Sequence, residues 1–190
     1  MSFVQRRRFL WICFLVSLVL LGLTAAFADG TTLARLRFDE LAQQSSAVAR
    51  LRCLGSEFHW ERGELWTETR FEVLERDKGL LSGIVTVRTI GGTSGHLHSH
   101  VDGVPIFRAG EEVYLFLWER PGEPYRVLGW AQGTFRIARH SESGAETVTH
   151  DSALLPLFDP RTRTFLHGGI RNLPVAIFQL KLRKALQQQN

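Results

Sequence analysis

The sequence predicts a mainly β protein: a small antiparallel, OB-like barrel of five or six strands, with a short N-terminal helix and a C-terminal helix. Three observations predict this class. Apolar and polar residues alternate with a period of two in several short segments. These segments follow one another closely and are separated by turns that contain glycine or proline. Helical periodicity is confined to one segment near each end of the remaining chain.

The first 28 residues have the pattern of an export signal. Arginines 6–8 precede an apolar run from Phe9 to Leu23, and Ala26-Phe27-Ala28 has the small-residue spacing that signal peptidase accepts. The apolar run is about 15 residues long, short of the roughly 20 that a spanning helix needs. We expect residues 1–28 to be cleaved, which leaves a periplasmic or extracellular protein without a stable membrane span. An uncleaved anchor is the alternative.

Charge and cysteine content exclude some function classes. The chain carries 23 Lys and Arg against 19 Asp and Glu, and three of the arginines lie in the predicted signal, which leaves a net charge of +1 for the rest. A near-neutral chain with mixed signs has no electrostatic footprint for nucleic acid. Outside the signal, Cys53 is alone, so it cannot form an internal disulfide. Its apolar surroundings favour a buried structural thiol.

The predicted barrel domain, residues 29–140, begins with a helix over 36–46, where Asp39 and Glu40 suit the helix dipole. A bent strand over 48–54 follows. Strict alternation over 65–73 predicts a half-buried strand that ends in a turn at Asp77-Lys78-Gly79. The remaining predicted strands cover 83–92, Val113–Trp118 (central and largely apolar), Tyr125–Leu128 and Thr134–Ile137.

Residues 141–190 are predicted to form a polar loop, a short hairpin and a C-terminal helix packed on the barrel. The hairpin turns at residues 159–162. In the helix, Asn172 is the expected N-cap and Pro174 fits the first turn. The expected apolar stripe consists of Ile177, Phe178, Leu182 and Leu186.

Several of these elements resemble a family of uncharacterised exported bacterial proteins. The resemblance rests on Lys78-Gly79, on the spacing of Pro105, Phe107, Gly110 and Glu111 within Gly103–Leu117, and on Gln132-Gly133-Thr134-Phe135, and it covers residues 36 to about 138. It implies an exported β protein and no established activity. The strand order is also similar to the OB-like barrels of netrin modules and tissue metalloproteinase inhibitors. Those inhibitors chelate a protease zinc through an N-terminal cysteine, which a chain starting near Asp29 lacks.

The stretch GGTSGHLHSHVDG, residues 91–103, holds His96, His98 and His100 at two-residue spacing. On an extended strand neighbouring members lie roughly 7 Å apart and the outer two about 13 Å, whereas an imidazole–zinc bond is only about 2 Å. Two of them can therefore share a zinc or copper ion with a further ligand. That ligand would come from His59, Glu61, Asp102, His140, His150 or His167. A solvated glycine-rich loop without a cofactor is the other interpretation.

Tryptophans supply the second candidate site. Trp60, Trp66 and Trp130 lie near turns or strand ends, where exposed indole rings bind protein, peptide or carbohydrate ligands. Packing in the core or rim of a small barrel is the alternative. Nucleophile-elbow, P-loop and metalloprotease patterns are absent from the sequence, so an enzyme is not favoured. The sequence predicts an exported, non-catalytic binding or accessory module, with a metal-dependent protein using His96–His100 as the alternative.

Overall fold

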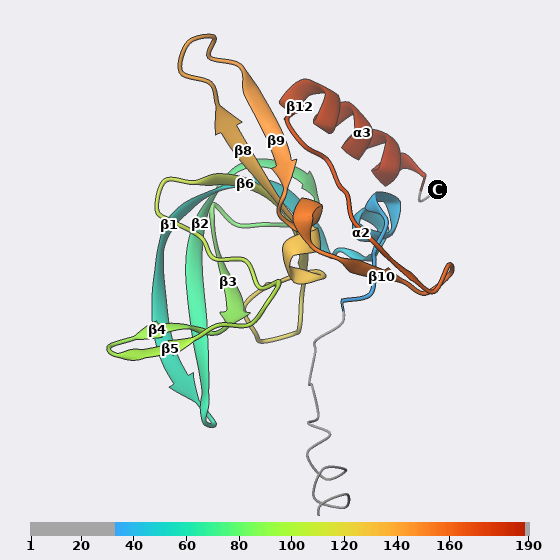
Figure 1. Cartoon of the computed structure of the whole chain (residues 1–190). Coiled ribbons are helices and arrows are strands. Elements are labelled where there is room, and N and C mark those ends of the chain that lie inside the picture. Colours follow the sequence, from blue (N-terminus) through green and yellow to red (C-terminus); the bar gives the residue numbers. More distant parts are fainter. Residues whose placement is uncertain (1–32, 189–190) are drawn as a thin grey trace, which may run out of the picture. The chain divides into compact units, whose positions relative to one another are not determined.

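A long β-hairpin organises the fold of residues 33–188, which are the residues that the computed structural model describes (Figure 1). The predicted signal peptide lies outside them. Strands β1 (Ala47–Glu61) and β2 (Glu64–Lys78) pair antiparallel along their whole length. Two residues join them, Arg62 at φ 52° and Gly63 at φ 85°. Two consecutive positive φ angles give the turn that matches the twist of paired strands.

Five elements follow one another in a ring. β1 pairs with β6 (Glu112–Trp118), and β2 pairs with β3 (Ile84–Ile90). β7 (Arg126–Val127) pairs with β6. Tyr125, just before β7, exchanges two main-chain hydrogen bonds with Thr86 and Arg88 of β3. The ring β1-β2-β3-β7-β6 is thus barrel-like and joined at one seam by few bonds. The mainly β, antiparallel class predicted from the sequence is confirmed.

A second group of strands extends the sheet beyond β6. β8 (Thr134–Arg139) pairs with β6, β9 (Glu146–His150) with β8, and β12 (Leu173–Pro174) with β9. The boundary that the sequence suggested at residue 140 falls between β8 and β9, which are neighbours in this one sheet. The other elements are β4 (Gly92–Ser94) with β5 (Leu97–Ser99), β10 (Leu157–Asp159) with β11 (Thr164–Leu166), and the 3₁₀ turns η1 (Trp130–Gly133) and η2 (Asp151–Leu154).

The central strands bury side chains on both faces, which creates two cores. Successive residues of a strand point to opposite faces. In β6, Val113, Leu115 and Leu117 face the barrel interior, whereas Tyr114 and Phe116 pack under the helices. All five are buried, as the apolar run in the sequence predicted. Cys53 is a buried thiol in the barrel core, also as predicted.

The two helices cover the second core. In α2 (Phe38–Gln44) the Glu40 carboxylate accepts a hydrogen bond from the Arg37 N–H at 2.8 Å, which satisfies a main-chain donor at the helix start. The helix lies within the range predicted from the sequence. α3 (Val175–Gln187) packs beside α2 at the other end of the chain.

Two details of the predicted C-terminal helix were wrong. Pro174, not Asn172, is the N-cap residue, because residues 173–174 form β12 and Asn172 has a φ of 47°. Ile177 is 48% exposed and does not belong to the apolar stripe. Starting one residue after Pro174, the helix turns a different set of positions towards the core: Val175, Phe178, Leu182 and Ala185.

Candidate functional site

A cleft opens at the end of the ring where the β1–β2 hairpin continues beyond β6. The β4–β5 hairpin crosses the inner face of this projecting part (Figure 1). The crossing is close. A Cβ atom on Gly92, which has a φ of 139°, would stand 2.6 Å from the Phe58 ring and 2.5 Å from the Thr67 hydroxyl. Only glycine permits this approach. Residues 92–99 of the glycine-rich stretch thus form a hairpin, whereas residues 100–103 form a turn as part of the connection to β6.

The cleft has a volume of about 120 Å³. An apolar cavity of about 150 Å³ holds a benzene molecule. The cleft is somewhat smaller, so it can enclose one side chain or most of a small ring, and the rest of the ligand would extend over the surrounding surface. Its walls come from the projecting hairpin, the end of β3, the β4–β5 hairpin and the segment leading to β6; the lining residues include Ser56, Phe58, Thr67, Thr69, Thr89, His98, His100, Ile106 and Phe107.

Hydroxyl groups concentrate on the inner wall of the cleft. Ser56 and Thr69 share a hydrogen bond of 2.8 Å between their hydroxyl oxygens, and Thr67 donates one of 2.5 Å to the Gly91 carbonyl. Thr69 and Thr89 are only 1% and 8% exposed. A single hydroxyl has one proton and two acceptor lone pairs, so the Ser56–Thr69 pair keeps further bonding capacity. These hydroxyl groups lie beside the rings of Phe58 and Phe107, which also line the cleft.

Two of the three clustered histidines line this cleft. The His98 Nδ1 atom lies 2.6 Å from the Thr93 hydroxyl, and the His100 Nε2 atom lies 3.2 Å from an Asp102 carboxylate oxygen. His96 lies in the turn of the β4–β5 hairpin and does not line the cleft. The three-histidine arrangement is therefore divided, and at most His98 and His100 can act together.

Of the predicted further ligands, Asp102 lies beside His100, and the other five lie elsewhere. His59 is paired with Glu68, Glu61 with Arg88, and His150 is stacked on Phe135. Burial lowers the pKa of His150, whose Nε2 atom contacts the Gln132 carbonyl oxygen at 2.6 Å. His140 and His167 are exposed and line no part of the cleft. Within residues 33–188, no three or more His, Cys, Asp or Glu side chains are grouped so that they could hold a metal ion.

The predicted tryptophan surface is not assembled as one site. Trp60 pairs with Leu65 and Trp66 pairs with His59, so the two indoles point to opposite faces of the hairpin. Trp60 is 52% exposed on the inner face, beyond the cleft. Trp66 lies on the outer face, where the guanidinium groups of Arg88 and Arg126 stand 4.3 and 5.2 Å from its ring. Trp130 belongs to η1, close to Gly103.

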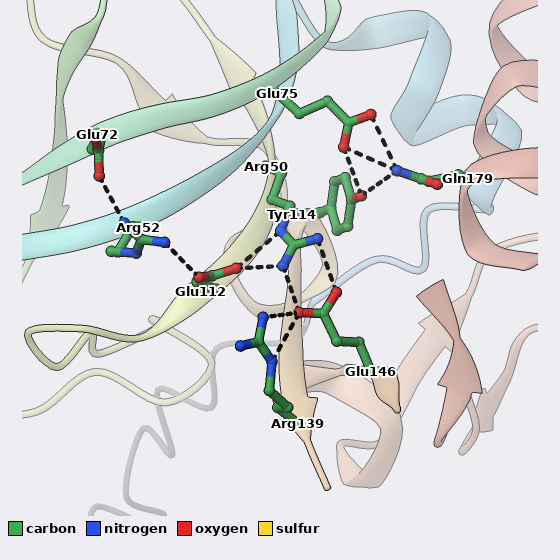
Figure 2. Close-up of polar contacts among 9 residues, drawn as sticks. All are labelled: Arg50, Arg52, Glu72, Glu75, Glu112, Tyr114, Arg139, Glu146 and Gln179. Atoms are coloured by element: carbon green, nitrogen blue, oxygen red, sulfur yellow. Dashed lines mark hydrogen bonds and ion pairs between the residues drawn. The ribbon is translucent and has the colours of Figure 1, made fainter. Parts of the chain in front are cut away.

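A dense charged network surrounds Arg50 and Arg52 of β1 (Figure 2). Both arginines alternate with residues of the barrel core, so they lie on the outer face of β1, away from the cleft. Arg50 donates hydrogen bonds to Glu112 and Glu146, and Arg52 joins Glu112 to Glu72. Burial lowers the pKa of Arg50, but its bonds to the two carboxylates outweigh that effect and raise it. Hydrogen bonds from Arg50 and Arg139 lower the pKa of Glu146 to about 2. The network ties β9 to β1 and β6, so we assign it to stability.

A second polar group in Figure 2 joins the hairpin to α3. Gln179 donates to both carboxylate oxygens of Glu75 and to the Tyr114 hydroxyl, at 2.9 to 3.1 Å. Burial, reinforced by Glu75, raises the pKa of Tyr114 to about 12. Burial and the same Glu75 raise the pKa of nearby Asp77 to about 6. One Asp77 oxygen is buried without a hydrogen-bond partner in the described part of the chain.

The hydroxyl wall of the cleft is a feature that sequence reasoning missed. Its signal is present in the alternating pattern. Thr67 and Thr69 occupy the same strand face as Leu65 and Phe71, and Thr89 follows Val85 and Val87 on the inner face of β3. Hydroxyl residues at strand positions that should fill a barrel core are the signal for such a wall.

Comparisons of the chain with protein-family models, with curated proteins and with solved structures find no match. Between residues 33 and 188 the structure contains no helix of the length and apolar character that crossing a bilayer requires.

Proposed function

We propose that this protein is an exported, non-catalytic binding module that takes one side chain or one sugar ring of its ligand into the cleft at the end of the barrel. The observation that carries the proposal is the lining of the cleft. The hydroxyls of Ser56, Thr67 and Thr69 stand against the rings of Phe58 and Phe107. A mainly apolar enclosure with a few converging polar groups is typical of ligand pockets.

Two further observations support this function. His98 and His100 stand at the rim, where imidazoles can donate to or accept from a polar ligand. The N-terminal arginines and apolar run support export, because they have the form of a cleaved signal. The ligand in this proposal is a protein, peptide or carbohydrate of the periplasm or the cell exterior.

Shift mapping by NMR tests the proposal with small probes. The ¹⁵N-labelled protein would be titrated with N-acetyl amino-acid amides and with monosaccharides, one at a time. We expect at least one probe to shift cleft amides, and Thr69→Val to weaken its binding about tenfold because a hydroxyl partner is lost. Thr86→Val, on the outer face of β3, is the matched control and should leave binding unchanged. If no probe changes the chemical shifts of the cleft amides, the proposal is overturned.

The metal-dependent alternative has its own measurement. Zinc and copper content would be determined in protein purified without a histidine tag and in the triple variant His96→Ala, His98→Ala, His100→Ala. Because only two of these histidines share the cleft, we expect equal and substoichiometric metal in both proteins. One equivalent of metal that disappears in the triple variant would replace the binding-module proposal with the metal-dependent one.

A further inference from the structure

The projecting half of β1, Gly55–Glu61, has only one paired edge. Its first edge is bonded to β2 throughout. Its second edge faces β6 only as far as Arg52, and the last main-chain bonds on that side join Cys53 to Gly110 and Glu111. Beyond Gly55 no strand of the described chain pairs with this edge. An unpaired strand edge is a template for adding an extended peptide.

The register shows which main-chain groups face the unpaired edge. The Leu65 carbonyl accepts a hydrogen bond from Gly91, so the main-chain groups of Leu65 point away from β1. Leu65 and Trp60 are therefore a non-hydrogen-bonded pair, and the main-chain groups of Trp60 point to the open side. By alternation, Phe58 and Ser56 do the same. Three N–H and three C=O groups are thus available to a docking strand.

The side chains beside this edge specify a pattern. The residues whose main-chain groups are open, Ser56, Phe58 and Trp60, turn their side chains to the inner face, where the first two line the cleft. Glu57 and Glu61 point to the outer face. Neighbouring strands place residues of like face side by side. A complementary strand would therefore carry apolar residues on its inner face and basic residues on its outer face.

The charge of the hairpin tip agrees with a basic partner. Residues 57–68 contain four glutamates and one arginine, a net charge of −3. Glu61 is neutralised by Arg88, but Glu57 and Glu64 are exposed and form no ion pair within residues 33–188. A second copy of the chain docked edge to edge would bring two such acidic tips together, which like-charge repulsion opposes. The charge favours a different, cationic chain as occupant.

We propose that the edge of β1 from Ser56 to Trp60 binds an extended peptide with alternating apolar and basic residues, which adds as an antiparallel strand and places one apolar side chain in the cleft. The inference rests on the proposed binding function and names the ligand class. Both strands already paired with β1 are antiparallel to it. In that orientation the apolar residues of the peptide donate and accept the hydrogen bonds opposite Ser56, Phe58 and Trp60.

The test uses the peptide Ac-Lys-Phe-Lys-Val-Lys-Phe-Lys-NH₂ and amide hydrogen exchange followed by NMR on the full chain. In the unliganded protein, the amides of Phe58 and Trp60 should exchange rapidly, whereas those of Glu57 and His59 should be protected by the β1–β2 ladder. We expect the peptide to slow exchange at Phe58 and Trp60 about tenfold or more and to leave Glu57 and His59 unchanged.

Three controls follow from the same geometry. The peptide with glutamate in place of every lysine should bind at least about tenfold more weakly, as should the original peptide towards Glu57→Lys; Glu142→Lys, an equal charge change in the exposed β8–β9 loop, should have no such effect. N-methylation of the apolar residues of the peptide should abolish binding because it removes the donors that face β1, whereas N-methylation of the lysines should preserve it.

Binding without protection at Phe58 and Trp60 would overturn the edge-pairing inference, and so would equal binding of the two N-methylated peptides. Protection at these amides that rises with protein concentration in the absence of peptide would overturn it in favour of a second copy. If amino-acid amides still shift the cleft in the earlier titration, the binding function stands and only the extended-peptide inference fails.

Discussion

The two halves of β1 have the same secondary structure and opposite surroundings. The first half, Ala47–Cys53, is paired on both edges and contributes side chains to both cores. The second half, Gly55–Glu61, is paired on one edge, and its residues are half-buried or exposed. A register shift between Cys53 and Gly55 separates the halves. One strand thus divides into a part that holds the fold and a part that offers surface.

The charged side chains differ between the halves in the same way. Arg50 and Arg52 in the first half are held by Glu112, Glu146 and Glu72 (Figure 2). In the second half Glu61 is paired with Arg88, but Glu57 has no ion pair within residues 33–188. Where charges are mutually satisfied they contribute stability, and where they are exposed they can select a partner. The difference teaches that the surface proposed for binding lies where the fold depends on it least.

The largest expected effect compares Leu51, in the first half of β1, with Leu54, which lies in the bulge between the two halves. Leu51→Ala should lower the free energy of unfolding by about 2–5 kcal/mol, because Leu51 is fully buried in the barrel core. Leu54→Ala should change it by less than about 1 kcal/mol, because Leu54 is 45% exposed. Urea unfolding followed by tryptophan fluorescence measures both. Equal losses would show that the bulge supports the fold as much as the first half of β1 does.

A smaller effect is expected from the arginines of the network. Arg50→Ala should cost about 1–3 kcal/mol, because it leaves two partly buried glutamates without their shared donor. Arg139→Ala, which removes a largely exposed partner of the same Glu146, should cost less than about 1 kcal/mol. Thermal unfolding of the two variants provides the comparison. If Arg139→Ala were the more damaging change, the assignment of Arg50 as the centre of the network would be wrong.

The smallest effects concern pH, and two acids near the first half of the hairpin should act in opposite directions. The folded pKa of Asp77 is raised from 3.8 to about 6, so ionising it costs stability increasingly between pH 4 and 6. Asp77→Asn should therefore stabilise the protein by roughly 1 kcal/mol at pH 7, since water screens part of the effect, and should have little effect at pH 4. Urea unfolding at both pH values measures the gain, which Asp151→Asn, a carboxylate paired with Arg136, should not reproduce.

Glu146 should show the reverse dependence. Its folded pKa of about 2 lies below the ordinary 4.5, so its stabilising contribution is complete above pH 4.5 and is lost as the pH falls towards 2. Glu146→Gln should lower the free energy of unfolding by about 1 kcal/mol at pH 7, a value that allows for solvent screening, and by almost nothing at pH 2. The same urea series provides the measurement. A constant deficit at every pH would point to lost packing instead of lost charge.

The sequence predicted the strands and helices better than it predicted the residues at which they begin and end. The alternation over 65–73 predicted β2, but the strand extends from Glu64 to Lys78 because its partner β1 continues the ladder where the apolar pattern has stopped. Strand pairing depends on the neighbouring backbone as well as on side-chain type. The C-terminal helix starts at Val175, and not directly after the expected cap Asn172, for a similar reason: pairing between β12 and β9 uses Leu173 and Pro174.

The candidate site was only partly accessible from the sequence. Strand geometry alone limited a shared metal ion to two of the three clustered histidines. In the structure, His98 and His100 are the two that line the cleft. Whether the tryptophans of the β1–β2 hairpin share a surface depends on the register of that hairpin. The register could not be predicted, because the turn, Arg62-Gly63, lacks the usual Asn-Gly signal. That register turns Trp60 and Trp66 to opposite faces.

By itself, the sequence determined the mainly β class, the two helices, the buried Cys53 and the inner and outer faces of the strands, because each follows from local periodicity or composition. The tertiary structure alone decided that the β4–β5 hairpin crosses the projecting β1–β2 hairpin, that hydroxyls line a cleft there, and that β1 extends beyond the end of β6. These features depend on contacts between segments far apart in the chain. Local sequence patterns do not show which distant segment will pack against a strand, or at which residue strand pairing will end.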